Sequence, residues 1–209
     1  MTINTILFDL DGTLIDSIGL IIKSYQHTFN KFLPEKSFSA SEIVSFTGYT
    51  LWQIFDQILP EKTDEMVECY KSYNLAHHDD EIKLFPGVAE GLEKLSSLNI
   101  KMGIISSKIH DTVLRGLKVT GIDKHFAIIL GADDVEEAKP NPEGILKALK
   151  FFNSQKQKTL MVGDNEHDIE AGINASVKTC LVYWTMSDKT NTKANYILKN
   201  MNDLLTIAK

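Results

Sequence analysis

Five short runs of nearly continuous apolar residues lie along the chain. They cover residues 5–8, 102–105, 126–130, 159–162 and 177–182. Runs of this kind are typical of strands buried on both faces, as in a parallel sheet. The later runs are separated by segments whose apolar residues follow helical spacing, at positions 111–118, 142–152 and 168–174. Because strands alternate with helices, the pattern predicts an α/β fold built on a doubly wound parallel sheet.

The stretch after the first predicted strand departs from this alternation. Residues 16–83 contain no strand-like run, and their apolar residues recur at helical spacing. A crossover between parallel strands needs only about a dozen residues, so we interpret this stretch as an inserted all-helical domain. A Phe-Pro-Gly turn signal at residues 85–87 follows its end. We therefore predict an α/β core formed by residues 1–15 and 84–209 and a small helical cap formed by residues 16–83.

Composition narrows the classes of function. The chain has 209 residues, of which 43% are hydrophobic and 24% charged, so it holds enough apolar material for a buried core. Its net charge is −6, which argues against nucleic acid as a partner, because phosphate backbones are bound by clustered Lys and Arg. No apolar run approaches the roughly 18 residues of a membrane span, so we expect no membrane partner either.

The cysteines and the N-terminal residues indicate the cellular compartment of the protein. Cys69 and Cys180 match no metal-ligand spacing. Two aspartates interrupt the first apolar stretch where that of a signal peptide would continue. These features predict a protein of the reducing cytoplasm. The sequence leaves open whether it is a monomer or a homodimer.

The end of the first predicted strand carries the most informative residues. Asp9 and Asp11 are two positions apart, so on an extended chain both side chains point to the same side. Gly12 then permits a tight turn or a close approach of the backbone. Two carboxylates about 4 Å apart repel each other by roughly 4 kcal/mol at an effective dielectric constant near 20. A hard divalent cation with oxygen ligands would relieve that repulsion.

Three further motifs follow in order. Ser106 comes after the second predicted strand, Lys139 precedes a Pro-Asn-Pro turn, and Asp164 and Asp168 follow the fourth strand as an acidic pair. Together with residues 9–13, these motifs resemble the haloacid dehalogenase superfamily of phosphohydrolases, and the resemblance covers essentially the whole chain. It implies the Rossmann-like core of that superfamily, with the helical cap inserted between its first and second motifs.

The resemblance implies catalytic roles for three residues. Asp9 would be the nucleophile that attacks phosphorus and forms an aspartyl-phosphate intermediate. Asp11 would protonate the leaving oxygen and then deprotonate the water that opens the intermediate. Lys139 would neutralise the nucleophile and the transferred phosphoryl group.

The resemblance also implies Mg²⁺ as the cofactor. The ion would be held by Asp9, by the backbone carbonyl of Asp11 and by Asp164. Asp168 would either bind the metal, directly or through water, or orient Lys139.

The same motifs imply a phosphate-binding set. The Ser106 hydroxyl and the Ser107 amide would hold a non-bridging phosphoryl oxygen. Gly12 and Thr13 are assigned to this set as well.

Substrate choice is expected to depend on the cap, which closes over the site and excludes water. Residues 47–50 interrupt a helical pattern, and they form either a loop pointed at the active site or an ordinary turn between helices. Residues 77–80, with the sequence His-His-Asp-Asp, suggest a metal cluster or a polar helix end. Adjacent histidines on a helix do not face one ligand, so we favour the helix end.

Within the superfamily, the chain resembles a group of bacterial pyrophosphatases and the related phosphoglycolate phosphatases. The similar segments are residues 5–16, 69–71 with 77–79, 161–168 and 184–185. We predict a magnesium-dependent phosphohydrolase acting on a small phosphorylated anion, with inorganic pyrophosphate as the first choice. Phosphoglycolate or another small metabolite is the alternative substrate.

Other functions on the same scaffold are disfavoured. Asp11 and Thr13 argue against a dehalogenase, and Asn165 argues against a phosphomutase, which would carry adjacent acidic ligands there. A non-catalytic module that binds phosphorylated ligands remains as the alternative from another class.

Overall fold

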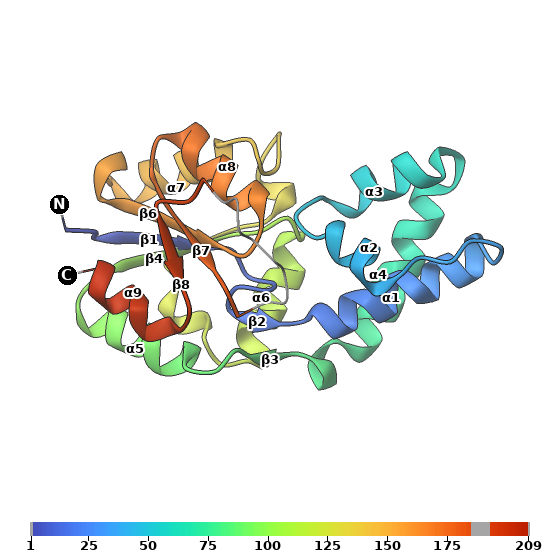
Figure 1. Ribbon diagram of the computed structural model, residues 1–209, viewed down its shortest axis with the longest axis horizontal. Coiled ribbons are helices and arrows are strands. Elements are labelled where there is room, and N and C mark those ends of the chain that lie inside the picture. Colours follow the sequence, from blue (N-terminus) through green and yellow to red (C-terminus); the bar gives the residue numbers. More distant parts are fainter. Residues whose placement is uncertain (1, 185–192, 209) are drawn as a thin grey trace.

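The computed structural model describes residues 2–184 and 193–208, so Thr185 of the resemblance lies outside the described part. An α/β body stands at one end of the elongated molecule and a bundle of helices at the other (Figure 1). Within the described ranges, none of the helices combines the length and hydropathy needed to cross a membrane.

The α/β body is built on one sheet of parallel strands in the order β5-β4-β1-β6-β7-β8. The strands are β1 (Thr5–Phe8), β4 (Lys101–Ile105), β5 (Ile128–Leu130), β6 (Thr159–Gly163), β7 (Lys178–Val182) and β8 (Tyr196–Leu198). The central strand β1 pairs with β4 on one side and with β6 on the other. This arrangement confirms the predicted fold class.

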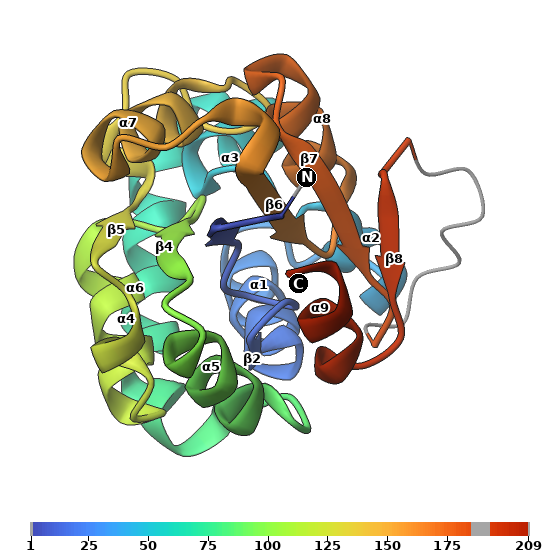
Figure 2. The ribbon, with the colours of Figure 1, turned by 90° about the vertical axis from the view of Figure 1, so that its left-hand side faces the viewer.

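Helices cover both faces of the sheet (Figures 1 and 2). One face carries α5 (Val88–Ser97), α6 (His110–Val119) and α9 (Met201–Ile207), and the other carries α7 (Glu143–Phe152) and α8 (Glu166–Ala175). The side chains of β1 alternate between the two layers. Ile6 and Phe8 pack under α5, α6 and α9, while Leu7 packs under α7 and α8. Because both faces are covered, all positions of the strand are apolar or buried, which explains the continuous run in the sequence.

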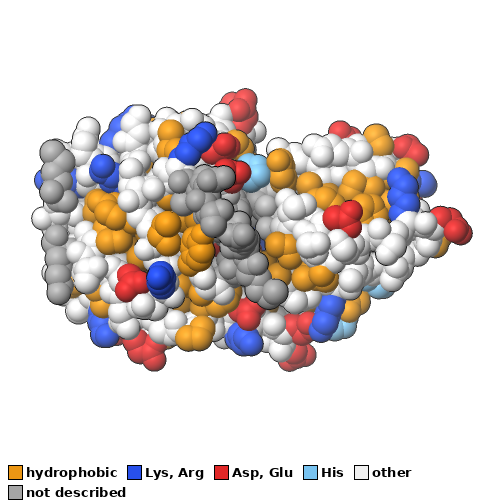
Figure 3. Space-filling view, viewed as in Figure 1, with side chains coloured by type: hydrophobic (Ala, Val, Ile, Leu, Met, Phe, Trp, Pro, Cys, Tyr) orange, Lys and Arg blue, Asp and Glu red, His pale blue; other side chains and the backbone are white. Residues whose placement is uncertain are grey.

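The long insert folds as helices. They are α1 (Ile18–Phe32), α2 (Ala40–Ser45), α3 (Leu51–Ile58) and α4 (Thr63–Glu81). Their hydrophobic core is separate from the two core layers of the sheet. Tyr25 lies at its centre, with its ring 4.8 Å from that of Tyr70 and 5.5 Å from that of Phe55. Hydrophobic side chains also remain visible on the surface of the insert (Figure 3), where Trp52 is 42% exposed.

A short antiparallel ribbon joins the insert to the sheet. It consists of β2 (Ile15–Asp16) and β3 (Lys83–Leu84), in which Asp16 lies opposite Lys83. The chain therefore leaves and re-enters the α/β body at one place. On this basis we propose the division into a core of residues 1–15 and 84–209 and a cap of residues 16–83.

Some elements differ from the sequence prediction. The third predicted strand, residues 126–130, begins only at Ile128, because residues 123–125 form a 3₁₀ turn ahead of it. Phe126 is apolar for another reason, since its ring packs edge-on against Phe8 at 6.1 Å. The predicted segments also omitted α5, α9 and the short edge strand β8, whose Ile197 is 49% exposed.

Candidate active site

The motifs converge at one edge of the sheet. Asp9, Ser106 and Asp164 directly follow β1, β4 and β6, which are neighbours in the sheet. Because these strands are parallel, their carboxyl ends lie together, as in other ligand sites of open α/β sheets. Asp168 is added by the first turn of α8, and Lys139 by the loop that precedes α7.

A buried lysine joins two of the carboxylates. The Lys139 Nζ atom lies 2.6 Å from Asp9 Oδ1 and 2.6 Å from Asp168 Oδ1, and all three residues are buried. Burial raises the pKa of Asp9 well above its usual value, and the charges of Asp168 and Asp164 raise it further, while Lys139 acts in the opposite direction. Burial alone would lower the pKa of Lys139, but the charges of Asp168 and Asp9 outweigh it and raise that pKa. Lys139 is thus a fixed cation beside Asp9.

Three carboxylates form a set that fits a divalent cation. Asp9, Asp164 and Asp168 each offer one oxygen, and these oxygens lie within 4.8 Å of one another. Gly12 permits this approach, because a Cβ atom there would lie only 2.5 Å from Asp164 Oδ2. Its φ of +81° is also one that other residues rarely adopt. Clustered, buried carboxylate oxygens are the donors that a hard cation such as Mg²⁺ prefers.

Asp168 differs from the other two acids in its hydrogen bonds. Its Oδ1 atom accepts from Lys139, and its Oδ2 atom accepts from the backbone N–H of Asn165 at 3.2 Å. With both oxygens engaged by the protein, the side chain is arranged to orient Lys139. Of the two roles that the sequence left open for Asp168, this geometry favours the second.

Asp11 forms an ion pair with a different lysine, Lys108. The Lys108 Nζ atom lies 2.7 Å from Asp11 Oδ1, and the Ser17 hydroxyl donates to the same oxygen. The repulsion expected between Asp9 and Asp11 is therefore relieved in part by two separate lysines. No role for Lys108 was predicted from the sequence, where its position directly after Ser106 and Ser107 was the available signal.

The four residues assigned to phosphate binding divide into two pairs. Ser106 and Ser107 line the cavity beside Asp9. Thr13 is fully buried instead, and its hydroxyl donates a long hydrogen bond of 3.4 Å to Asp9 Oδ2. Gly12 packs against Asp164, as described above. Neither Gly12 nor Thr13 lines the cavity, so their position suits a role in shaping the loop that carries Asp9.

The cavity lies between the sheet edge and the cap and has a volume of about 80 Å³. Its core side is formed by Asp9, Asp11, residues 106–108 and Asn165. Its cap side is largely apolar and aromatic, with Ile21, Tyr25, Phe46, Thr47, Gly48, Tyr49, Leu51 and Tyr70.

The cap loop of residues 47–50 touches the core directly. Ser107 Oγ donates a hydrogen bond of 2.8 Å to the Gly48 carbonyl, and the Tyr49 ring lies 4.2 Å from that of His167. A Cβ atom on Gly48 would come within 2.8 Å of His167 Nδ1. Of the two interpretations of this loop, the structure favours the one that points it at the site.

The His-His-Asp-Asp stretch at residues 77–80 lies in the last turn of α4. Among the residues that the structure describes, only Asp9, Asp164 and Asp168 are grouped closely enough to hold a metal. Within the stretch, Asp79 contacts His78 and Arg115, and this geometry favours the polar helix end over the metal cluster.

Comparison with known proteins gives one consistent family. A family model described as "Haloacid dehalogenase-like hydrolase" matches residues 6–182. A protein named pyrophosphatase PpaX from Listeria monocytogenes is 46% identical over 99% of this chain and 97% of its own length. The protein of the same name from Anoxybacillus flavithermus is 44% identical over the same shares.

Solved structures agree with this result. A haloacid dehalogenase-like family hydrolase from Streptococcus pneumoniae superposes with a TM-score of 0.87 at 29% identity, covering 99% of each chain. A candidate phosphoglycolate phosphatase from Lactobacillus plantarum superposes with a TM-score of 0.90 at 25% identity, covering 99% of this chain and all of the other.

Proposed function

Because the chain belongs to the haloacid dehalogenase-like hydrolase family, we propose that it is a magnesium-dependent phosphohydrolase of inorganic pyrophosphate that acts through a phosphorylated Asp9. The observation that carries the proposal is the arrangement of Asp9, Lys139 and Asp164 at one sheet edge, with Asp11 lining the same side of the cavity as Asp9.

In the first step, a carboxylate oxygen of Asp9 forms a bond to phosphorus while the bond from phosphorus to the leaving oxygen breaks. Asp11 gives its proton to that leaving oxygen. Lys139, held by Asp168 at 2.6 Å, keeps positive charge beside the nucleophile as negative charge spreads over the phosphoryl oxygens. Ser106 and Ser107 line the side of the cavity where those oxygens would be held.

In the second step, Asp11 takes a proton from water, and the water oxygen attacks phosphorus and releases the Asp9 carboxylate with inorganic phosphate. When bound by Asp9, Asp164 and the backbone carbonyl of Asp11, Mg²⁺ would supply further positive charge for the phosphoryl oxygens. The cap excludes bulk water from these groups.

The substrate assignment rests on two supports. The two relatives from Listeria monocytogenes and Anoxybacillus flavithermus are named pyrophosphatases, and the cavity is small, at about 80 Å³. A small anion suits such a space better than a large sugar phosphate. We also propose a cytoplasmic location, which the free thiols of Cys69 and Cys180 support.

A substrate panel tests this proposal. Phosphate release is measured with and without Mg²⁺ on pyrophosphate, 2-phosphoglycolate and several sugar phosphates. We expect kcat/KM for pyrophosphate to exceed the others by about 100-fold or more, equivalent to roughly 2.7 kcal/mol of discrimination. A preference for 2-phosphoglycolate would replace the substrate while keeping the mechanism. No turnover of any compound would favour a binding module instead.

A further inference from the structure

One cation faces the cavity from the side of Asp11. Among the described residues that line the cavity, Lys108 is the single lysine or arginine. Lys139 lies behind Asp9, where it contacts the two buried carboxylates. The two lysines are therefore divided between the two acids, with Lys139 beside the proposed nucleophile and Lys108 beside the proposed proton donor.

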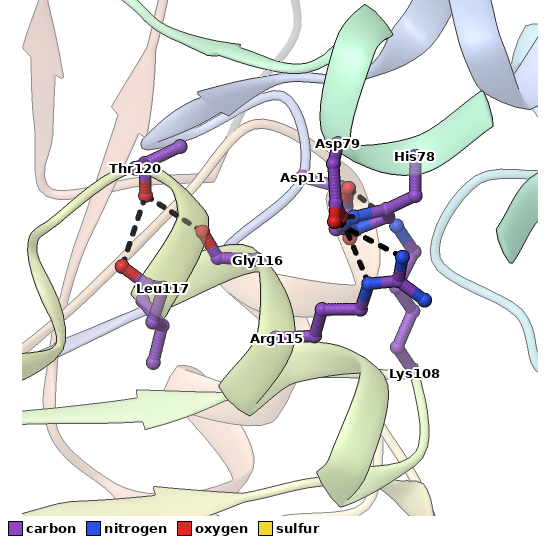
Figure 4. Close-up of polar contacts among 8 residues, drawn as sticks. All are labelled: Asp11, His78, Asp79, Lys108, Arg115, Gly116, Leu117 and Thr120. Atoms are coloured by element: carbon purple, nitrogen blue, oxygen red, sulfur yellow. Dashed lines mark hydrogen bonds and ion pairs between the residues drawn. The ribbon is translucent and has the colours of Figure 1, made fainter. Parts of the chain in front are cut away.

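The position of Lys108 is fixed by its backbone. Its N–H donates a hydrogen bond of 3.1 Å to Ser106 Oγ, and its carbonyl accepts one of 2.8 Å from the N–H of Ala132. From this anchored position its side chain reaches Asp11 (Figure 4), with 21% of the side chain exposed. A lysine ammonium carries three donors, and among the described residues it donates only to Asp11. The remaining donors suit an anion that lies beside Asp11.

The neighbouring basic residues are committed elsewhere. Arg115, the only arginine of the sequence, donates to both oxygens of Asp79, at 2.8 and 3.0 Å. His78 is 2% exposed and contacts Asp79 at 2.9 Å, and burial lowers the pKa of its imidazole. Figure 4 shows the contact of Arg115 on α6 with Asp79 on α4, and the contact of His78 with Asp79 within α4, next to Lys108 and Asp11. The Arg115–Asp79 contact joins the cap to the core, and both basic residues are paired, which leaves Lys108 as the cation for a ligand.

We propose that Lys108 is the specificity-determining residue for the leaving group, and that it selects small substrates whose leaving group carries negative charge. The inference rests on the proposed function, because the leaving group lies beside Asp11, and so beside Lys108, only if Asp11 is the proton donor. A charge-assisted hydrogen bond from Lys108 would bind the second phosphate of pyrophosphate or the carboxylate of 2-phosphoglycolate equally. An uncharged leaving group would gain nothing from it. The cap wall opposite is apolar and aromatic and offers no competing charge.

The test compares substrates with charged and uncharged leaving groups. Pyrophosphate and 2-phosphoglycolate, called the charged substrates below, have leaving groups that carry an anionic group besides the departing oxygen. The leaving group of p-nitrophenyl phosphate carries no such group. In Lys108→Met we expect kcat/KM for the preferred charged substrate to fall about 100-fold, and its ratio to kcat/KM for p-nitrophenyl phosphate to fall at least about 20-fold. Lys108→Arg keeps the charge and should retain about a tenth or more of the parent value. Lys118→Met removes one exposed lysine of α6 and should leave the ratio unchanged.

The outcomes separate this inference from the proposed function. Equal falls in kcat/KM on the charged substrates and on p-nitrophenyl phosphate would mean that Lys108 acts only through Asp11, and would overturn the inference. So would a parent enzyme that hydrolyses p-nitrophenyl phosphate but neither charged substrate. Retained turnover in Asp9→Asn would overturn the proposed function itself. Hydrolysis of p-nitrophenyl phosphate by Lys108→Met shows that the variant is folded. The charged substrate whose kcat/KM falls most in this variant identifies the leaving group that Lys108 binds.

Discussion

Replacement of Asp9 by Asn is expected to abolish turnover while leaving the fold intact. The amide has nearly the same shape but cannot attack phosphorus, so the rate of p-nitrophenyl phosphate hydrolysis should fall by about 10⁴-fold or more, equivalent to roughly 5.5 kcal/mol. Burial raises the pKa of Asp9 well above its usual value, which means that its charge destabilises the folded state at neutral pH. The melting temperature of Asp9→Asn should therefore be no lower than that of the parent.

A matched control distinguishes loss of the nucleophile from loss of any carboxylate. Asp56 is exposed on α3, and Asp56→Asn should keep the parent rate. If Asp9→Asn retained more than about a hundredth of that rate, a different group would be the nucleophile and the proposed mechanism would be wrong.

Replacement of Asp164 by Asn is expected to weaken the dependence of the enzyme on its metal. Asp164 lies in the buried group with Asp9 and Asp168, whose carboxylate oxygens are close enough to one another to hold a metal ion. Loss of even an outer partner of a metal ligand costs about 10–100-fold in affinity. We therefore expect the Mg²⁺ concentration for half-maximal p-nitrophenyl phosphate hydrolysis to rise at least about 100-fold.

Glu166 provides the control for this prediction, because it is an exposed acid two positions away on α8. Glu166→Gln removes the same charge and should leave the Mg²⁺ titration unchanged. Calorimetric titration of Mg²⁺ into both variants measures binding without turnover. Parental Mg²⁺ affinity in Asp164→Asn would remove Asp164 from the proposed ligand set.

Much of the fold could be predicted from local patterns. A strand covered on both faces is nearly continuous in apolar residues, so β1, β4 and β6 could be predicted from their amino-acid composition. The edge strand β8 was not, because Tyr196 and Ile197 are exposed and three residues give no pattern. The strand predicted at residues 126–130 wrongly included Phe126. Its apolar ring packs against Phe8, which comes from a distant part of the chain.

The candidate site shows the same division between local and distant information. The order of motifs placed Asp9, Ser106 and Asp164 at neighbouring strand ends, and the structure brings them together. The pairing of Lys108 with Asp11 depends on side chains 97 positions apart, which no local spacing encodes. Thr13 was assigned to the phosphate, yet it is buried beneath Asp9, because the turn after β1 directs it inward.

The most direct test of the proposed mechanism is a pre-steady-state measurement on Asp11→Asn. A p-nitrophenolate leaving group needs no proton, so Asp9 should still be phosphorylated, while the missing base slows attack by water. We predict a burst of about one p-nitrophenol per active site, followed by slow release. The burst should disappear when Asp9→Asn is added. Linear release at the parent rate from the first turnover, or a burst that survives the second substitution, would contradict an aspartyl-phosphate on Asp9.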